Sequence, residues 1–197
     1  MNRRSVIRFI NSPIKQKKMR KLTNDELNRL TVDEYRKAAK MPVAIVLDNV
    51  RSANNVGSVF RTADCLGAER LCLCGITATP PNKDINKTAL GATESVDWKH
   101  FASTLDAVAE LRAEGYTILS VEQAEGSIAL QDFVPANGSK YALIFGHEVN
   151  GVAQEVVDAS DGCIEIPQVG TKHSFNISVS AGIVIWEVFR KMRKREF

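Results

Sequence analysis

One stretch of the sequence shows the fold most clearly: Val43-Ala-Ile-Val-Leu-Asp-Asn-Val-Arg-Ser-Ala-Asn-Asn-Val-Gly-Ser-Val-Phe-Arg61. It begins with a continuous apolar run that ends at Asp48, which is typical of a strand buried on both faces of a sheet. From Asn55 to Leu66 the apolar residues recur at helical spacing, and Gly67 follows as a stop signal. A buried strand that leads through a polar turn into a helix is the unit from which α/β folds are built.

The same alternation of strands and helices continues along the chain. Further strands are predicted at Arg70–Cys74, Tyr116–Val121, Tyr141–Phe145 and Cys163–Ile166. Helices are predicted over Thr23–Lys40, Ser103–Glu114, Val152–Ala159 and Asn176–Lys194, with a loop over Thr77–Asn86. This order predicts an α/β fold, an open parallel sheet of Rossmann-like type with helices on both faces. We expect residues 41–197 to form this domain, and residues 1–40 to form a basic N-terminal arm with one helix.

The charge of the chain is distributed unevenly. Its 197 residues hold 26 Lys and Arg against 23 Asp and Glu, a net charge of +3. Residues 1–40 carry a net charge of +8 and residues 190–197 one of +4, whereas residues 41–189 carry −9. An acidic body with basic ends favours a polyanionic partner such as nucleic acid or an anionic membrane surface, although two solvated tails would give the same pattern.

Composition and motifs argue against several classes of protein. No apolar run is long enough to cross a bilayer, and residues 1–21 lack the apolar core of a secretory signal. The four cysteines match no zinc spacing, and two of them, Cys72 and Cys74, would lie on one face of a strand as buried free thiols. We therefore expect no metal site, no membrane association and a reduced, cytoplasmic location. A glycine-rich dinucleotide loop, a P-loop and a nucleophile elbow are all absent from the sequence.

Three polar segments follow predicted strands, at the edge where open parallel sheets bind their ligands. The first runs from Asn49 to Arg61, and both helix N-termini and Arg side chains suit phosphate groups. Simpler explanations exist for each of its polar residues. Asn55 could be an ordinary helix N-cap, and Arg61 could form an ion pair with Asp64.

The second segment is Gly146-His-Glu148-Val-Asn-Gly151, whose glycines let a ligand approach the backbone closely. We favour a site role for Glu148 over a plain interaction with a helix dipole, and expect His147 to be a solvated loop residue. The third segment is Ile166-Pro-Gln-Val-Gly-Thr-Lys-His-Ser-Phe-Asn176, which places small polar residues at the start of a helix. A helix capped by Ser or Asn would be the simpler explanation of that composition.

Taken in order, these segments resemble the three motifs of the SpoU/TrmH family of RNA ribose 2′-O-methyltransferases, within the SPOUT superfamily. The resemblance covers about Pro42 to Val188 and includes the stretch from Pro80 to Val96. It implies S-adenosylmethionine as methyl donor, tRNA or rRNA as substrate, and a homodimer whose active site lies at the subunit interface. It also implies a C-terminal trefoil knot, which topology alone would make very improbable.

The resemblance also assigns roles to residues. The catalytic residues of the family fall on Asn55, Arg61, Glu148, Ser174 and Asn176. Its cofactor contacts, mostly backbone, fall on Val121, Glu122, Gly146, Ile166, Gln168, Ser174 and Phe175, the last of which stands where the family often has Leu or Met. Family accounts often make the Arg the base. Because Arg stays protonated in proteins, we expect Arg61 instead to hold the phosphate beside the target ribose.

Two other functions stay open at this level. The chain could be a non-catalytic RNA-binding or assembly factor that retains the fold, or a small-molecule nucleotide enzyme on a Rossmann-like sheet. The intact motif residues argue against the first, and the missing glycine-rich loop argues against the second. The basic ends of the chain are expected to add phosphate contacts that weaken with salt.

Overall fold

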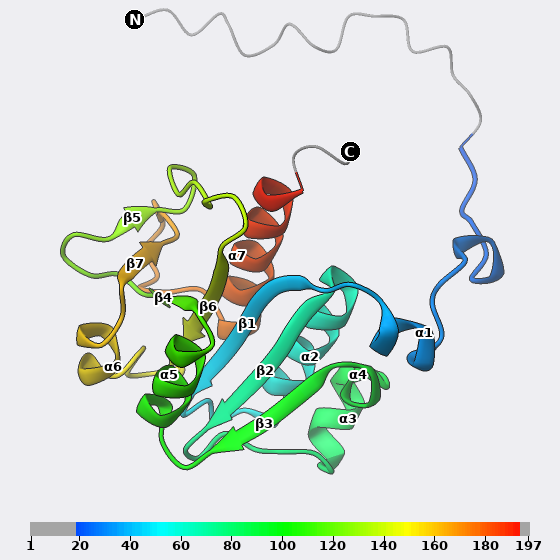
Figure 1. The fold of residues 1–197 in the computed structure, drawn as a ribbon, viewed down its shortest axis with the longest axis horizontal. Coiled ribbons are helices and arrows are strands. Elements are labelled where there is room, and N and C mark those ends of the chain that lie inside the picture. The colour runs from blue at the N-terminus through cyan, green and yellow to red at the C-terminus, as the bar shows by residue number, and fades with distance from the viewer. Residues whose placement is uncertain (1–18, 194–197) are drawn as a thin grey trace, which may run out of the picture. The chain divides into compact units, whose positions relative to one another are not determined.

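The structure of the chain, a computed structural model, describes residues 19–193 (Figure 1). The chain divides into two compact units, Met1–Thr31 and Val32–Phe197. The described part of the first unit contains one short 3-10 helix, η1 (Asp25–Leu27). The predicted basic ends lie partly outside the described residues, since residues 1–18 and 194–197 are not among them.

In the described part of the second unit, seven strands form one sheet. They are β1 (Met41–Asp48), β2 (Ala68–Cys74), β3 (Asp97–Phe101), β4 (Tyr116–Val121), β5 (Ile128–Ala129), β6 (Lys140–Phe145) and β7 (Gly162–Glu165). Their order is β3-β2-β1-β6-β4-β7-β5, and every pairing is parallel. The predicted α/β fold with an open parallel sheet is confirmed. The knot stays a prediction of the family resemblance.

The described helices of this unit lie close to most of the predicted ones. They are α1 (Val32–Lys37), α2 (Ala53–Leu66), α3 (Lys83–Ala89), α4 (Ala92–Ser95), α5 (Thr104–Ala113), α6 (Gln154–Asp158) and α7 (Ile177–Met192). The helices predicted around α2, α5, α6 and α7 are confirmed, with ends shifted by a few residues. Neither α3 nor α4 is part of the prediction, and α3 begins inside the predicted loop Thr77–Asn86.

Helices cover both faces of the sheet because its central strands are apolar on both sides. In β1, Val43, Ile45 and Leu47 point into a core shared with α2 and α7. The intervening Ala44 and Val46 point into a second core, shared with α5 and α6. Figure 1 shows α5 in front of the sheet and α2 with α7 behind it. Successive side chains of a strand alternate between faces, so this continuous apolar run fills both cores.

The single helix predicted over Thr23–Lys40 is wrong. Glu26 does reach back to Thr23 and accepts its backbone N–H at 2.8 Å, as in a capping box. The chain then leaves helical geometry at Asn28, which has a left-handed φ of 46°. No residue of η1 or of α1 is fully buried, and of these two helices only Tyr35 of α1 packs against the core, so little apolar contact is available to extend either one.

The prediction that Cys72 and Cys74 are buried free thiols on a strand is confirmed in β2. Cys72 and Cys74 are free and buried, and burial raises the pKa of each to about 12. Thiols that stay protonated in a core are chemically inert, so these two side chains contribute packing only.

Within residues 19–193, no helix is both long and apolar enough to cross a membrane. The same residues contain no group of three or more His, Cys, Asp or Glu side chains that could hold a metal ion.

A glycine decides how closely α3 packs against α2. A Cβ added to Gly57 would lie 2.2 Å from the carbonyl oxygen of Ile85 and 2.2 Å from Oγ1 of Thr88. In an exposed helix, Gly→Ala stabilises by roughly 1 kcal/mol. We expect the reverse here: Gly57→Ala should lower the free energy of unfolding by about 1–3 kcal/mol, because α3 must move away. Thermal unfolding measures this, with Ser58→Ala in the same turn as the control. A raised melting temperature for Gly57→Ala would contradict the close packing.

Candidate active site

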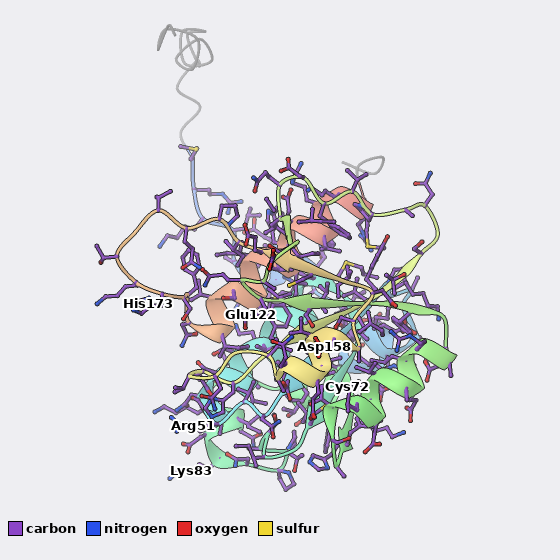
Figure 2. All side chains as sticks on the ribbon, turned by 90° about the vertical axis from the view of Figure 1, so that its left-hand side faces the viewer. Arg51, Cys72, Lys83, Glu122, Asp158 and His173 are labelled. Carbon is purple, nitrogen blue, oxygen red and sulfur yellow. The ribbon has the colours of Figure 1, made fainter. Side chains whose placement is uncertain are left out.

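The second and third polar segments come together at the carboxyl edge of the sheet. They border a cavity of about 1110 Å³ beyond the ends of β4, β6 and β7. Its walls come from residues 121–125, 145–152, 154, 157–158, 166, 168, 173–177 and 180. Ligand sites in proteins usually measure about 300–1000 Å³, so this cavity has room for a nucleotide-sized molecule. Figure 2 shows the loop that bears His173 projecting to one side of Glu122.

The carboxylate of Glu148 joins the second segment to the first. Its Oε2 accepts the backbone N–H of Arg51 at 3.0 Å, and its Oε1 accepts the backbone N–H of Ser52 at 2.9 Å. The side-chain amide of Asn55 also donates to Oε1, at 3.1 Å. These three bonds hold the turn between β1 and α2 against the turn after β6.

The third segment joins the same network through Asn176. Its side-chain amide donates to Oδ1 of Asn55 at 3.3 Å, and its own Oδ1 accepts the backbone N–H of Ser178 at 2.9 Å as the N-cap of α7. The N-cap of α2 is Ser52 and not Asn55, whose side chain is thereby left to bridge Glu148 and Asn176. Asn55, Glu148 and Asn176 thus form one chain of hydrogen bonds between the three segments.

The environment of Glu148 favours its ionised form. Partial burial opposes the charge, but the N–H groups of Arg51 and Ser52 and the amide of Asn55 outweigh it. The pKa of this carboxyl therefore lies below its ordinary value. A carboxylate held by backbone donors is suited to fixing loops, whereas a general base needs a higher pKa.

All seven residues predicted to contact a cofactor line the cavity: Val121, Glu122, Gly146, Ile166, Gln168, Ser174 and Phe175. Position 146 requires glycine because the backbone of Val152 passes close to it: a Cβ on Gly146 would lie 2.1 Å from the backbone nitrogen of Val152. Glu122 fixes the same turn from the other side, because its Oε2 accepts the N–H of Val152 at 3.0 Å. His147 has a local role: its Nδ1 accepts the backbone N–H of Val149 at 3.0 Å.

Sequence reasoning missed the part played by Asp48. This carboxylate is only 2% exposed at the end of β1. Its Oδ1 accepts the hydroxyl of Thr104 at 2.6 Å, and its Oδ2 accepts the backbone N–H of Ala153 at 2.9 Å. It therefore ties the first segment to the start of α5 and to the residue before α6. An acidic residue that ends an otherwise apolar strand was the available signal.

Arg61 lies away from this network. Its side chain is exposed on α2 and is not among the residues that line the cavity. The ion pair with Asp64 that the sequence suggested is not formed, since Asp64 accepts the hydroxyl of Ser95 instead. Among residues 19–193, the guanidinium of Arg61 has no hydrogen-bond or salt-bridge partner.

The order of these segments agrees with a known family. A family-wide sequence model, that of the SpoU rRNA Methylase family, matches residues 42–186. The chain belongs to this family. It is 28% identical over 165 residues to a TrmH-family tRNA/rRNA methyltransferase of Bacillus subtilis, with 81% of this chain and 65% of that protein covered. It is also 28% identical over 170 residues to a tRNA (guanosine(18)-2′-O)-methyltransferase of Thermus thermophilus, with 86% and 85% covered.

A solved structure agrees with the SpoU assignment. An AdoMet-bound rRNA methyltransferase from Sinorhizobium meliloti superposes with a TM-score of 0.71 at 26% identity, covering 80% of this chain and 59% of that one. This SpoU-family chain therefore spans about three fifths of that structure and about two thirds of the Bacillus protein. The family predicted from the three segments is confirmed.

The cavity of this SpoU-family chain is acidic. Four carboxylates line it, those of Glu122, Glu125, Glu148 and Asp158, and the described lining residues include no Lys or Arg. Such a lining favours a ligand with positive charge and disfavours phosphate groups.

The bonds of Glu148 give a testable dependence on pH. Glu148→Gln keeps the size of the side chain but turns an amide N–H₂ toward backbone N–H donors, so we expect it to lower the free energy of unfolding by about 1–3 kcal/mol at neutral pH. Because the folded pKa lies below the ordinary 4.5, this contribution is complete above that pH and is lost as the pH falls through the folded pKa. Thermal unfolding between pH 3 and 7 measures the difference. Glu155→Gln, an exposed site on α6, is the control, and equal stabilities of wild type and Glu148→Gln at pH 7 would contradict the bonding.

Proposed function

We propose that this chain is an S-adenosylmethionine-dependent methyltransferase that methylates a ribose 2′-hydroxyl of tRNA or rRNA. The observation that carries the proposal is the chain of hydrogen bonds through Asn55, Glu148 and Asn176 beside a ligand-sized cavity. Support comes from the Thermus relative, which is named as a tRNA 2′-O-methyltransferase and is covered over 85% of its length. The alternative, a non-catalytic RNA-binding factor, would need neither the cavity nor the hydrogen bonds that fix the loops around it.

The cavity fits the proposed donor in size and in charge. S-adenosylmethionine carries a cationic sulfonium, and four carboxylates without Lys or Arg complement it. Gly146 lines the cavity without a side chain, so an adenine ring can approach the backbone there closely. The residues that would hold the donor are Val121, Glu122, Gly146, Ile166, Gln168, Ser174 and Phe175, all on the cavity wall.

The residues of the chain would then act mainly by positioning. When bound, S-adenosylmethionine supplies a methyl group that is already activated for transfer. Asn55, Ser174 and Asn176 orient the ribose, and Glu148 keeps the loops in place. Holding two reactants in line can lower a barrier by roughly 7–11 kcal/mol. Arg61 stays protonated and binds the phosphate beside the ribose, so the hydroxyl proton passes to that phosphate or to a neighbouring group.

We further propose that the active form is a homodimer in the cytoplasm. The dimer follows from the family resemblance, and one surface of the structure supports it. The outer side of α7 carries Val179, Ile183 and Trp186, spaced as one helical face, and Trp186 is 53% exposed. A groove of about 540 Å³ runs beside this face. Large exposed apolar side chains next to a groove are typical of a protein interface.

The function is tested with isotopically labelled S-adenosylmethionine and total RNA, followed by nuclease digestion and mass spectrometry. We expect a labelled 2′-O-methyl nucleoside with the wild type, and at least about a hundredfold less with Arg61→Lys, because Lys lacks the planar fork that grips a phosphate. The exposed Arg29→Lys is the matched control. Donor binding without any labelled nucleoside would favour the non-catalytic factor. If Arg61→Lys kept native turnover and native RNA affinity, the guanidinium of Arg61 would have no role in catalysis or in phosphate binding.

The dimer is tested by sedimentation velocity. Trp186→Glu places a charge on the apolar side of α7 and should shift the chain from dimer to monomer at micromolar concentration, because an interface tolerates a buried unpaired charge poorly. Val134→Glu, at a side chain that is 80% exposed in the loop before β6, controls for the added charge. A wild type that sediments as a monomer, or a variant that remains a dimer, would contradict an interface on α7.

A further inference from the structure

The cavity by itself would repel the phosphates of an RNA strand. Four carboxylates line it, with no Lys or Arg among the described lining residues. Affinity for nucleic acids comes largely from Lys and Arg that contact phosphates. Under the proposed function, the cations that bind RNA therefore have to lie outside the cavity, on a surface that leads to it.

Four exposed cations lie on α3, on α2 and on the turn before α2. They are Arg51, Arg61, Lys83 and Lys87, which we call the α2–α3 basic surface. Within residues 19–193, none of these four side chains has a hydrogen-bond or salt-bridge partner; Arg51 uses only its backbone N–H, toward Glu148. Charges without partners in the folded chain remain available for a ligand.

Hydrogen bonds connect this surface to the cavity wall, since the backbone N–H of Arg51 donates to the lining residue Glu148 at 3.0 Å. The hydroxyl of Thr88 on α3 donates to the carbonyl oxygen of Asn54 at 2.9 Å, and the next residue, Asn55, donates to Glu148. The missing side chain at Gly57 allows this close contact of the two helices. The helix α3 is thereby held beside the turn that Glu148 fixes.

The cations also share an orientation. Lys83 and Lys87 are one helical turn apart on the exposed side of α3, about 6 Å along its axis. Arg61 follows Gly57 by four residues, so it lies one turn beyond the contact with α3 on the same side of α2, and its side chain is exposed. Figure 2 shows Arg51 and Lys83 at the same side of the molecule as His173, which borders the cavity.

Acidic residues do not cancel this charge. The exposed carboxylates nearby are those of Asp84 on α3 and Glu94 on α4, against four cations. Asp64 on α2 is a third carboxylate, and it keeps its charge because its partner, the hydroxyl of Ser95, is neutral. The surface therefore has a net positive charge beside an acidic cavity.

We propose that the α2–α3 basic surface binds the phosphate backbone of the RNA strand next to the nucleotide that enters the cavity. Lys83 and Lys87 take successive phosphates, and Arg51 takes the one nearest the cavity. The stretch from Pro80 to Val96, which the three motifs leave without a role, thus becomes a strand guide. This inference rests on the proposed function and adds to it the surface that holds the substrate.

The test measures RNA affinity against salt for the double variant Lys83→Ala/Lys87→Ala, with unfractionated tRNA and rRNA as probes. Each lost phosphate contact reduces the slope of log K against log salt by about 0.7 to 0.9, so the double variant should lose about 1.4 to 1.8. Donor affinity by calorimetry should stay unchanged, because neither lysine lines the cavity. The change should appear with both probes, because phosphate contacts carry no sequence information.

The matched control is Lys99→Ala/Lys140→Ala, which removes the same charge from the other side of the sheet, where Lys99 pairs with Glu110. A slope loss equal to that of the control, or no loss, would overturn the proposed surface. So would a change in sedimentation, which would identify α3 as a contact between protein chains. An RNA slope loss without any methylation would sink the enzymatic function and leave the surface standing, so the two failures are distinguishable.

Discussion

The arrangement of the site depends on one carboxylate, that of Glu148, and on the backbone N–H groups it accepts from Arg51 and Ser52. These donors sit 96 or more residues away in sequence, on the turn that opens α2. Ser52 is the N-cap of α2 and Arg51 precedes it, so neither N–H has a partner inside the helix, and an anion satisfies both at little cost. Glu148 therefore acts as an internal anion, and the turn it captures brings Asn55 into reach of Asn176.

The same device recurs at two other strand ends. Asp48 at the end of β1 accepts the N–H of Ala153, and Glu122 after β4 accepts the N–H of Val152. Three carboxylates from three strands thus bind backbone donors around one edge of the sheet. Hydrogen bonds to charged acceptors are about twice as strong as neutral ones, and backbone donors cannot rotate away. Rigid walls of this kind are what a reaction governed by positioning requires.

Much of this could be predicted from the sequence because its strong signals were local. Apolar runs predicted the buried strands around Val43 and Tyr141. Because parallel strands end at the same edge of a sheet, the polar segments after these strands had to meet at that edge. The prediction failed where tertiary contacts decide: α3 depends on its contact with Gly57, and β3 is an exposed edge strand with little apolar pattern. Asp48 was missed because an acidic strand end has no signature until Thr104 and Ala153 are seen beside it.

The net charge of +3 conceals a division between cavity and surface. Carboxylates that tie the loops also make the cavity acidic, so the charges that stabilise the site are those that exclude a polyanion from it. A cationic donor and an anionic strand can then be bound side by side without competing for the same groups. The strand must be held from outside, by cations that the fold leaves without partners. Arg61 lies outside its own cavity, so its guanidinium does not neutralise the carboxylates that we propose to attract the cationic donor.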